Sequence, residues 1–151
     1  MGKDRLHLDF ESWSELDLTK VGASRYARHH STEVLMLAYA INDEPVEQWV
    51  PAHGEPMPRI LKREILPDPN ILKFCWNASF ERQIFTHTLG LEIPFEQWRD
   101  PMVLAHSLSL PGSLDKAGQV VGLGDDQKKL ARGKALIRLF CQPRKPTKYK
   151  P

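Results

Sequence analysis

The sequence predicts an α/β fold built on a mixed sheet, in which an antiparallel N-terminal meander is joined by a parallel strand and flanked by helices. Three observations favour it. Residues 6–11 alternate between apolar and polar types, residues 33–41 and 46–50 are strand candidates separated by a turn, and residues 71–76 form a short apolar strand that leads into a helix. With 151 residues and 41% hydrophobic content the chain can bury one core, so one domain is expected.

The first predicted strand carries two carboxylates. Because strand side chains alternate between faces, Leu8 and Phe10 face the core while Asp9 and Glu11 share the opposite face. Residues two apart on a strand lie ~6.5 Å apart, a spacing that allows two carboxylates to converge on one divalent ion. A half-solvated antiparallel strand also alternates in this way, so these two carboxylates alone do not identify a metal site. A third ligand elsewhere in the chain is needed.

That partner follows the apolar strand at residues 71–76. Asn77 is suited to cap a helix, and Glu81 then lies in or just beyond the first helical turn. In open α/β sheets, sites are built where strands end in this way. A second interpretation stays open, in which Glu81 only complements the helix dipole and Phe80 belongs to the core.

The remaining elements suit the same sheet. Residues 42–45, Asn-Asp-Glu-Pro, form a turn that makes a hairpin of the two strands around it. The apolar spacing in residues 57–66 predicts a helix that begins at Pro56 or Pro58. This helix would lead the chain back to the strand that begins at residue 71.

Three later helices are expected. Asp100 and Pro101 have the types of an N-cap and a first helical residue, for a helix through Leu108, and this gives Asp100 a structural role. A short helix is expected over residues 114–121, and an amphipathic one over residues 128–141.

Composition narrows the class of protein. No apolar run is long enough to span a bilayer and the chain does not open as a signal peptide would, so no membrane contact and a cytoplasmic location are expected. Cys75 and Cys141 have apolar neighbours and no Cys-x-x-Cys spacing, which favours reduced core thiols. The six histidines form no ligand pattern, and His29 and His30 are interpreted as exposed loop residues.

The net charge of +2 hides an uneven distribution. Residues 127–151 contain nine Lys or Arg and no acid, which leaves a formal charge of −7 on the first 126 residues. Lys128, Lys129 and Arg132 are suited to follow a phosphate backbone, although a solvated helix face explains them equally well. We expect the folded domain to cover residues 1–141, with residues 142–151 forming a basic, proline-rich tail or linker.

These motifs together carry a resemblance. The chain resembles the 3′-to-5′ exonuclease domain of DEDD (DnaQ-like) enzymes, in the form fused to family A DNA polymerases of bacteriophages and prophages. Asp9-Phe10-Glu11 resembles the first exonuclease motif of that family, and residues 77–81 resemble the second, with Glu81 where many relatives have aspartate. Further segments of the phage type are residues 15–18, 20–22, 25–27, 33–40, 110–114 and 133–143.

The resemblance implies a ribonuclease H-like fold and a two-metal, proofreading-type nuclease that acts on single-stranded DNA or a DNA 3′ end. It implies that Asp9 bridges two Mg²⁺ or Mn²⁺ ions, that Glu11 binds the ion that activates water, and that Glu81 binds the second ion. Phe10, Asn77 and Phe80 are then expected near the terminal nucleotide, and a polymerase domain is the expected partner.

One family motif is missing. Relatives carry a tyrosine or histidine followed four positions later by aspartate on a late helix, and no such pair follows Glu81 in this sequence. Two alternatives therefore stay open: a noncatalytic nucleic-acid-binding or polymerase-associated module with the exonuclease fold, and a small interaction protein whose carboxylates are coincidental. The sequence does not decide between DNA and RNA.

Overall fold

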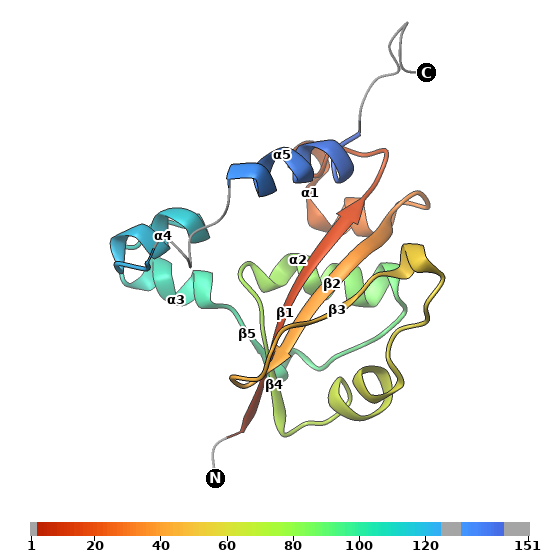
Figure 1. The fold of residues 1–151 in the computed structure, drawn as a ribbon, viewed down its shortest axis with the longest axis horizontal. Helices are drawn as coiled ribbons and strands as arrows, with labels where there is room; N and C mark the ends of the chain where they lie inside the picture. The colour runs from red at the N-terminus through yellow and green to blue at the C-terminus, as the bar shows by residue number, and fades with distance from the viewer. Residues whose placement is uncertain (1–2, 125–130, 144–151) are drawn as a thin grey trace, which may run out of the picture.

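A computed structural model describes residues 3–124 and 131–143, and its centre is a five-stranded sheet in the order β3-β2-β1-β4-β5 (Figure 1). β1 (Asp4–Trp13) pairs antiparallel with β2 (Glu33–Ile41), which pairs antiparallel with β3 (Glu47–Trp49). β4 (Ile71–Phe74) joins the other side of β1 in parallel, followed by β5 (Trp98–Arg99). The predicted meander with a parallel strand is confirmed, while the two-residue strand β5 escaped prediction.

The alternation in β1 fixes which face of the sheet is covered. Leu8 and Phe10 are each 5% exposed, whereas Asp9 between them is exposed. In the register with β2, Phe10 lies opposite Leu37 and Asp9 opposite Ala38. A register shift follows Glu11, so the strand is irregular just beyond the second carboxylate.

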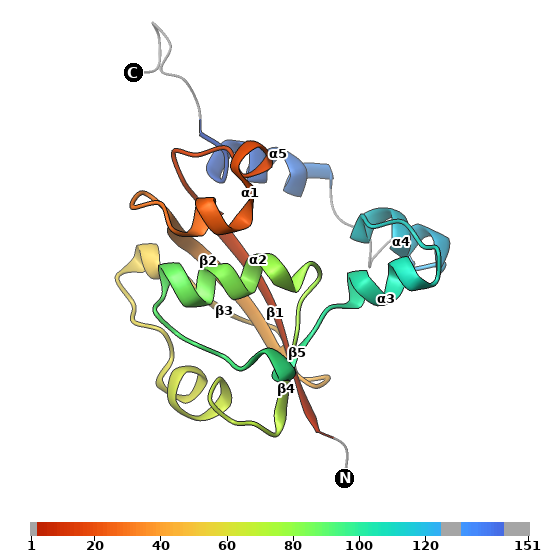
Figure 2. The same cartoon turned by 180° about the vertical axis from the view of Figure 1, so that it is seen from behind.

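Two helical segments cover the apolar face (Figure 2). α2 (Ala78–Gln83) continues into the π-helical turn η3 (Ile84–Thr88), and α1 (Leu18–Ala27) packs beside it. The sequence did not predict α1, because it has little amphipathic character and Gly22 breaks the helical backbone at φ 76°. Asp17 caps its start by accepting from the Thr19 backbone N–H at 3.0 Å.

The other elements lie around the sheet. They are η1 (Pro51–His53), η2 (Leu61–Ile65), η4 (Phe95–Gln97), α3 (Pro101–Ser107), α4 (Leu114–Val120) and α5 (Ala131–Phe140). The helix expected over residues 57–66 is shorter than predicted, since Pro58 disfavours helical backbone at the residue before it. In the part of the chain that the structure describes, no helix combines the length and the apolar character needed to cross a bilayer.

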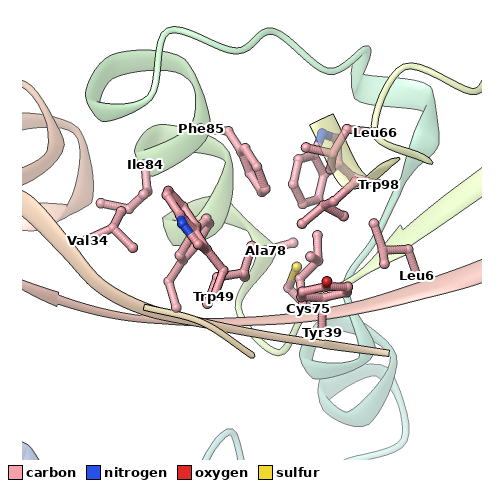
Figure 3. Packing of buried hydrophobic residues seen from close by; sticks show 14 of the residues in the cluster. Leu6, Val34, Tyr39, Trp49, Leu66, Cys75, Ala78, Ile84, Phe85 and Trp98 are labelled. Atoms are coloured by element: carbon pink, nitrogen blue, oxygen red, sulfur yellow. The ribbon is translucent and has the colours of Figure 1, made fainter. Parts of the chain in front are cut away.

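The core lies between the sheet and the α2–η3 segment (Figure 3). Phe85 is its centre: its ring lies 4.9 Å from that of Phe10, edge to face, and 5.8 Å from that of Trp98. Aromatic pairs of this kind add to the free energy gained by burial. Residues far apart in sequence thereby fasten α2 to the strand that carries Asp9.

Lys73 is a charged residue within this core. It is 0% exposed, and its Nζ donates to the carbonyl oxygens of Asp68 at 2.9 Å and Ile71 at 2.8 Å, and to the Gln97 side-chain oxygen. Burial lowers the pKa of Lys73 to about 8. These hydrogen bonds join β4 to the segment that precedes β5.

Replacing Lys73 with alanine is expected to lower the free energy of unfolding by ~3 kcal/mol. The change leaves a cavity and removes the donor that satisfies the buried Gln97 side chain. Denaturant unfolding measures the effect. Lys62→Ala, at an exposed position, is the control and should change stability by less than ~0.5 kcal/mol; equal stability of the two variants would contradict the prediction.

Candidate active site

Asp9 and Glu11 lie on the face of the sheet that α1 and α2 leave uncovered, which is turned toward the viewer in Figure 1. Asp9 is exposed and Glu11 is half-buried. Their shared face and i, i+2 spacing follow from the strand itself, in which residues two apart lie ~6.5 Å apart along the backbone.

Glu81 approaches the same place from α2. That helix starts four residues after β4 ends, so Glu81 lies in its first turn, where it is 3% exposed. Its pKa is raised to about 8: burial is the largest cause and the negative charges of Asp9 and Asp100 add to it, while hydrogen bonds from the backbone N–H groups of Glu81 and Phe10 oppose it. Among the described residues, its Oε2 atom has no hydrogen-bond partner. The helix therefore holds a buried carboxylate oxygen, unsatisfied by those residues, close to Asp9.

Such an arrangement fits a divalent cation. The negative charge of Asp9, which helps raise the pKa of Glu81, is offset when an ion of charge +2 lies between the two carboxylates, and a buried oxygen without a partner gains a ligand bond. Asp9, Glu11 and Glu81 all offer carboxylate oxygens, the ligands that Mg²⁺ and Mn²⁺ prefer, although in this structure the ligand atoms of the three do not all lie within 4.8 Å of one another.

Asp100 holds the helix that carries Glu81. Its Oδ1 accepts from the backbone N–H groups of Asn77 at 3.0 Å and Met102 at 2.9 Å, and its Oδ2 accepts from Ala78 at 3.0 Å. The predicted N-cap role of Asp100 in α3 is confirmed, and it extends to the start of α2. The predicted N-cap position of Asn77 in α2 is confirmed, but its backbone is left-handed (φ 67°) and its side chain makes no capping hydrogen bond to the described residues.

Comparison with known proteins relates the chain to part of a phage polymerase and to several solved nuclease and polymerase folds. No family model matches the chain. A curated DNA polymerase of Bacillus phage SP02 is 37% identical to it over 143 residues, which are 95% of this chain and 22% of the polymerase. The chain is a homologue of part of a phage DNA polymerase. It spans about a fifth of the length of that relative.

Solved structures agree on the fold. The chain matches Escherichia coli RNase D, an exoribonuclease, with a TM-score of 0.56 and 20% identity over 78% of this chain and 28% of that one. It matches a family B DNA polymerase of Pyrobaculum calidifontis with a TM-score of 0.60 and 15% identity, over 91% and 21% of the two chains. It matches Brucella melitensis NrnC, solved with bound Mg²⁺, with a TM-score of 0.56 and 12% identity over 88% of this chain and 63% of that one. The predicted ribonuclease H-like fold of the DEDD exonucleases is confirmed.

In this phage polymerase homologue, the late helix brings a thiol to the site. α5 lies over the same face of the sheet as Glu11 (Figure 1), and the Cys141 Sγ at its end donates to Glu11 Oε2 at 3.2 Å. The pKa of Cys141 is raised to about 12, mainly by burial and secondly by the hydrogen bond to Glu11 and its negative charge. The thiol therefore keeps its proton at neutral pH. A protonated thiol is a poor ligand for Mg²⁺. Cys75 is the buried core thiol that the sequence predicts, while Cys141 is a half-buried neighbour of a predicted metal ligand.

The residues predicted to contact nucleic acid have different surroundings. Phe10 is 5% exposed on the covered face of the sheet, so its side chain is part of the core and that prediction is wrong. Phe80 is half-buried, with its ring 6.1 Å from that of Tyr26, and Asn77 is exposed beside Glu81's helix. Lys128, Lys129 and the side chain of Arg132 lie outside the described residues, and so do residues 144–151 of the expected tail.

A hollow that the sequence did not reveal lies beside Asp9. It has a volume of about 290 Å³ and is mostly apolar, with His7 and Phe74, whose rings lie 5.5 Å apart, on the sheet. Trp76 forms part of its wall and donates its indole N–H to the Gly112 carbonyl at 3.0 Å. The alternation of β1 already placed His7 on the face of Asp9, but only the register with β4 brings Phe74 beside it.

Replacing Asp100 with alanine is expected to cost ~2 kcal/mol of stability and to lower nuclease activity at least tenfold, because Glu81 loses the hydrogen bonds that fix its helix. Denaturant unfolding and a Mg²⁺ titration of activity measure both effects. Asp17→Ala removes a comparable cap from α1, so it should reduce stability alone. Equal activity loss in the two variants would contradict a positioning role for Asp100.

Proposed function

We propose that this chain is a 3′-to-5′ exonuclease unit that hydrolyses phosphodiester bonds at DNA 3′ ends and works with a polymerase domain. The observation that carries the proposal is the buried Oε2 of Glu81, which has no partner among the described residues and lies close to Asp9. This pair occurs in the fold of known exonucleases and in a homologue of a phage DNA polymerase. The phage relative favours DNA as the substrate.

Asp9, Glu11 and Glu81 would hold two Mg²⁺ or Mn²⁺ ions. By the resemblance, Asp9 would contribute to holding both ions, Glu11 would hold the ion that activates water, and Glu81 would hold the second ion directly or through water. When bound, such a pair of ions supplies an activated water and stabilises the charge on the leaving 3′ oxygen.

The chain's own residues position these groups. Phe10, Phe85 and Trp98 fix the strand and helix that carry the carboxylates. Burial of Glu81 keeps water away from its side of the site. The hollow beside Asp9 has apolar walls on which a nucleotide base can stack, and the basic residues of the C-terminal segment would contact the phosphate backbone.

The test is digestion of a 5′-labelled single-stranded DNA oligonucleotide with Mg²⁺ or Mn²⁺. We expect a ladder that shortens from the 3′ end and is lost with EDTA. Because Cys141 stands beside Glu11 and the third family motif is absent from the sequence, turnover should be slow. If the folded protein shows no metal-dependent digestion at all, exonuclease activity of this chain is refuted.

The Cys141–Glu11 contact also favours a second candidate function, a noncatalytic nucleic-acid-binding module with the same fold. In that case the protein should bind single-stranded DNA equally well with EDTA and with Mg²⁺, with an affinity that falls as salt rises, and should leave the oligonucleotide intact.

A further inference from the structure

A second group of ligating side chains lies away from the three carboxylates. Glu15 follows the end of β1, and His29 and His30 follow α1; one ligand atom from each lies within 4.8 Å of the other two. No ligand pattern was expected here from the sequence, because the side chains of adjacent residues diverge in a strand or helix. In the structure these histidines occupy a tight turn instead, and their ring centroids lie 4.3 Å apart.

Hydrogen bonds fix the two loops against each other. Ser31 Oγ lies 2.7 Å from His29 Nδ1 and accepts from the Glu15 backbone N–H at 3.0 Å. The hydroxyl of Ser14, 0% exposed, lies 3.2 Å from the same oxygen. One hydroxyl therefore links the backbone of Glu15 to the ring of His29.

This network leaves a metal-binding atom available on His29. When Nδ1 carries the hydrogen, it donates to Ser31 Oγ instead of accepting the longer 3.4 Å contact from the Ser31 backbone N–H. The Ser31 hydroxyl can then donate to Ser14 Oγ, and His29 Nε2 keeps a lone pair for a metal. Metal-binding histidines are commonly oriented by such a hydrogen bond from the second ring nitrogen.

We propose that Glu15, His29 and His30 form a second metal site, for a first-row transition metal such as Zn²⁺. Two imidazoles and one carboxylate are a donor set of that class, with further positions left for water. The chemistry differs from that of Asp9, Glu11 and Glu81, whose donors are all oxygens. The two sites should therefore select different ions.

An ion held there would link the loop after β1 to the turn before β2, at the end of the sheet where β1 finishes (Figure 1). Because the ligands come from both sides of α1, they are brought together only in the folded chain. The ion should then raise the unfolding temperature by binding the folded state preferentially.

The test is a Zn²⁺ titration of the full chain with Asp9→Ala, in excess Mg²⁺, followed by calorimetry and, with Co²⁺, by visible absorption. We expect one equivalent of Zn²⁺ and a Co²⁺ spectrum typical of nitrogen ligands. His30→Gln and Glu15→Gln should each weaken Zn²⁺ binding at least tenfold. The exposed His87, changed to Gln, is the matched control and should leave binding unchanged.

Unfolding temperatures without metal show whether each variant is folded. His30→Gln is the decisive change, since His29 also contacts Ser31 and its loss can disturb the turn. Zn²⁺ affinity that is the same in the parent, His30→Gln and Glu15→Gln overturns the proposal, as does equal weakening by His87→Gln. No readout depends on nuclease activity, so the outcome is independent of the proposed function.

Discussion

Asp9→Ala is expected to remove metal-dependent digestion, a loss of ~10³-fold or more, while the protein stays folded. The proposed site loses the carboxylate whose charge contributes most to raising the pKa of Glu81. Metal ions contribute several kcal/mol to such reactions, and a loss of ~4 kcal/mol corresponds to a factor of ~10³. Stability should change little because Asp9 is exposed on the open face of the sheet. The oligonucleotide assay and a thermal melt measure the two quantities.

The matched control for this variant is Asp43→Ala. Asp43 is an exposed aspartate whose ion pair with Arg5 spans 3.5 Å at the surface, away from Glu81. The Asp43→Ala variant should digest DNA at the rate of the unmodified chain. Activity that survives Asp9→Ala would show that the carboxylates of β1 are not the catalytic ones.

Glu81→Gln is expected to stabilise the metal-free protein at high pH and to abolish digestion. The pKa of Glu81 is raised from 4.5 to about 8, so between those values the folded state binds more protons than the unfolded state. The free energy of unfolding of the unmodified chain therefore falls as pH rises through that window. Glutamine has the shape of the protonated acid and does not ionise, so the free energy of unfolding of the variant should exceed that of the parent by up to ~5 kcal/mol near pH 9 and nearly match it near pH 5.

Denaturant unfolding in EDTA at several pH values tests this prediction. The exposed Glu92, changed to Gln, should follow the parent at every pH. Mg²⁺ should raise the stability of the parent at high pH but leave Glu81→Gln unchanged, because the variant lacks the buried carboxylate. A stability difference between parent and Glu81→Gln that does not vary with pH would contradict an ionising, buried Glu81.

Local sequence patterns predicted the elements whose structure depends on residues close together in the sequence. The alternation of residues 6–11 placed Asp9 and Glu11 on one face, and the turn at residues 42–45 placed β2 against β3. The Asp100-Pro101 pair marked the start of α3 for the same reason, since a cap acts over two or three residues.

Features that depend on partners distant in sequence were not predictable in this way. β5 has two residues and owes its existence to pairing with β4. Asn77 is of a residue type that often caps helices with its side chain. Here, however, the start of α2 is held by Asp100, 23 residues later, which accepts a hydrogen bond from the Asn77 backbone N–H. The pairing of Cys141 with Glu11 spans 130 residues. In each case tertiary contact, rather than local propensity, decides the structure.

The three hydrogen bonds of Asp100 have a consequence for the order in which the chain folds. All three proposed ligands lie within the first 81 residues, but the group that fixes the start of α2 comes later, from the far end of β5. Contacts of that sequence separation form slowly, after local ones. During synthesis, a nascent chain that ends before residue 100 carries every proposed ligand without the carboxylate that orients Glu81. Competence for metal binding should therefore be acquired in one late step, when β5 joins the sheet.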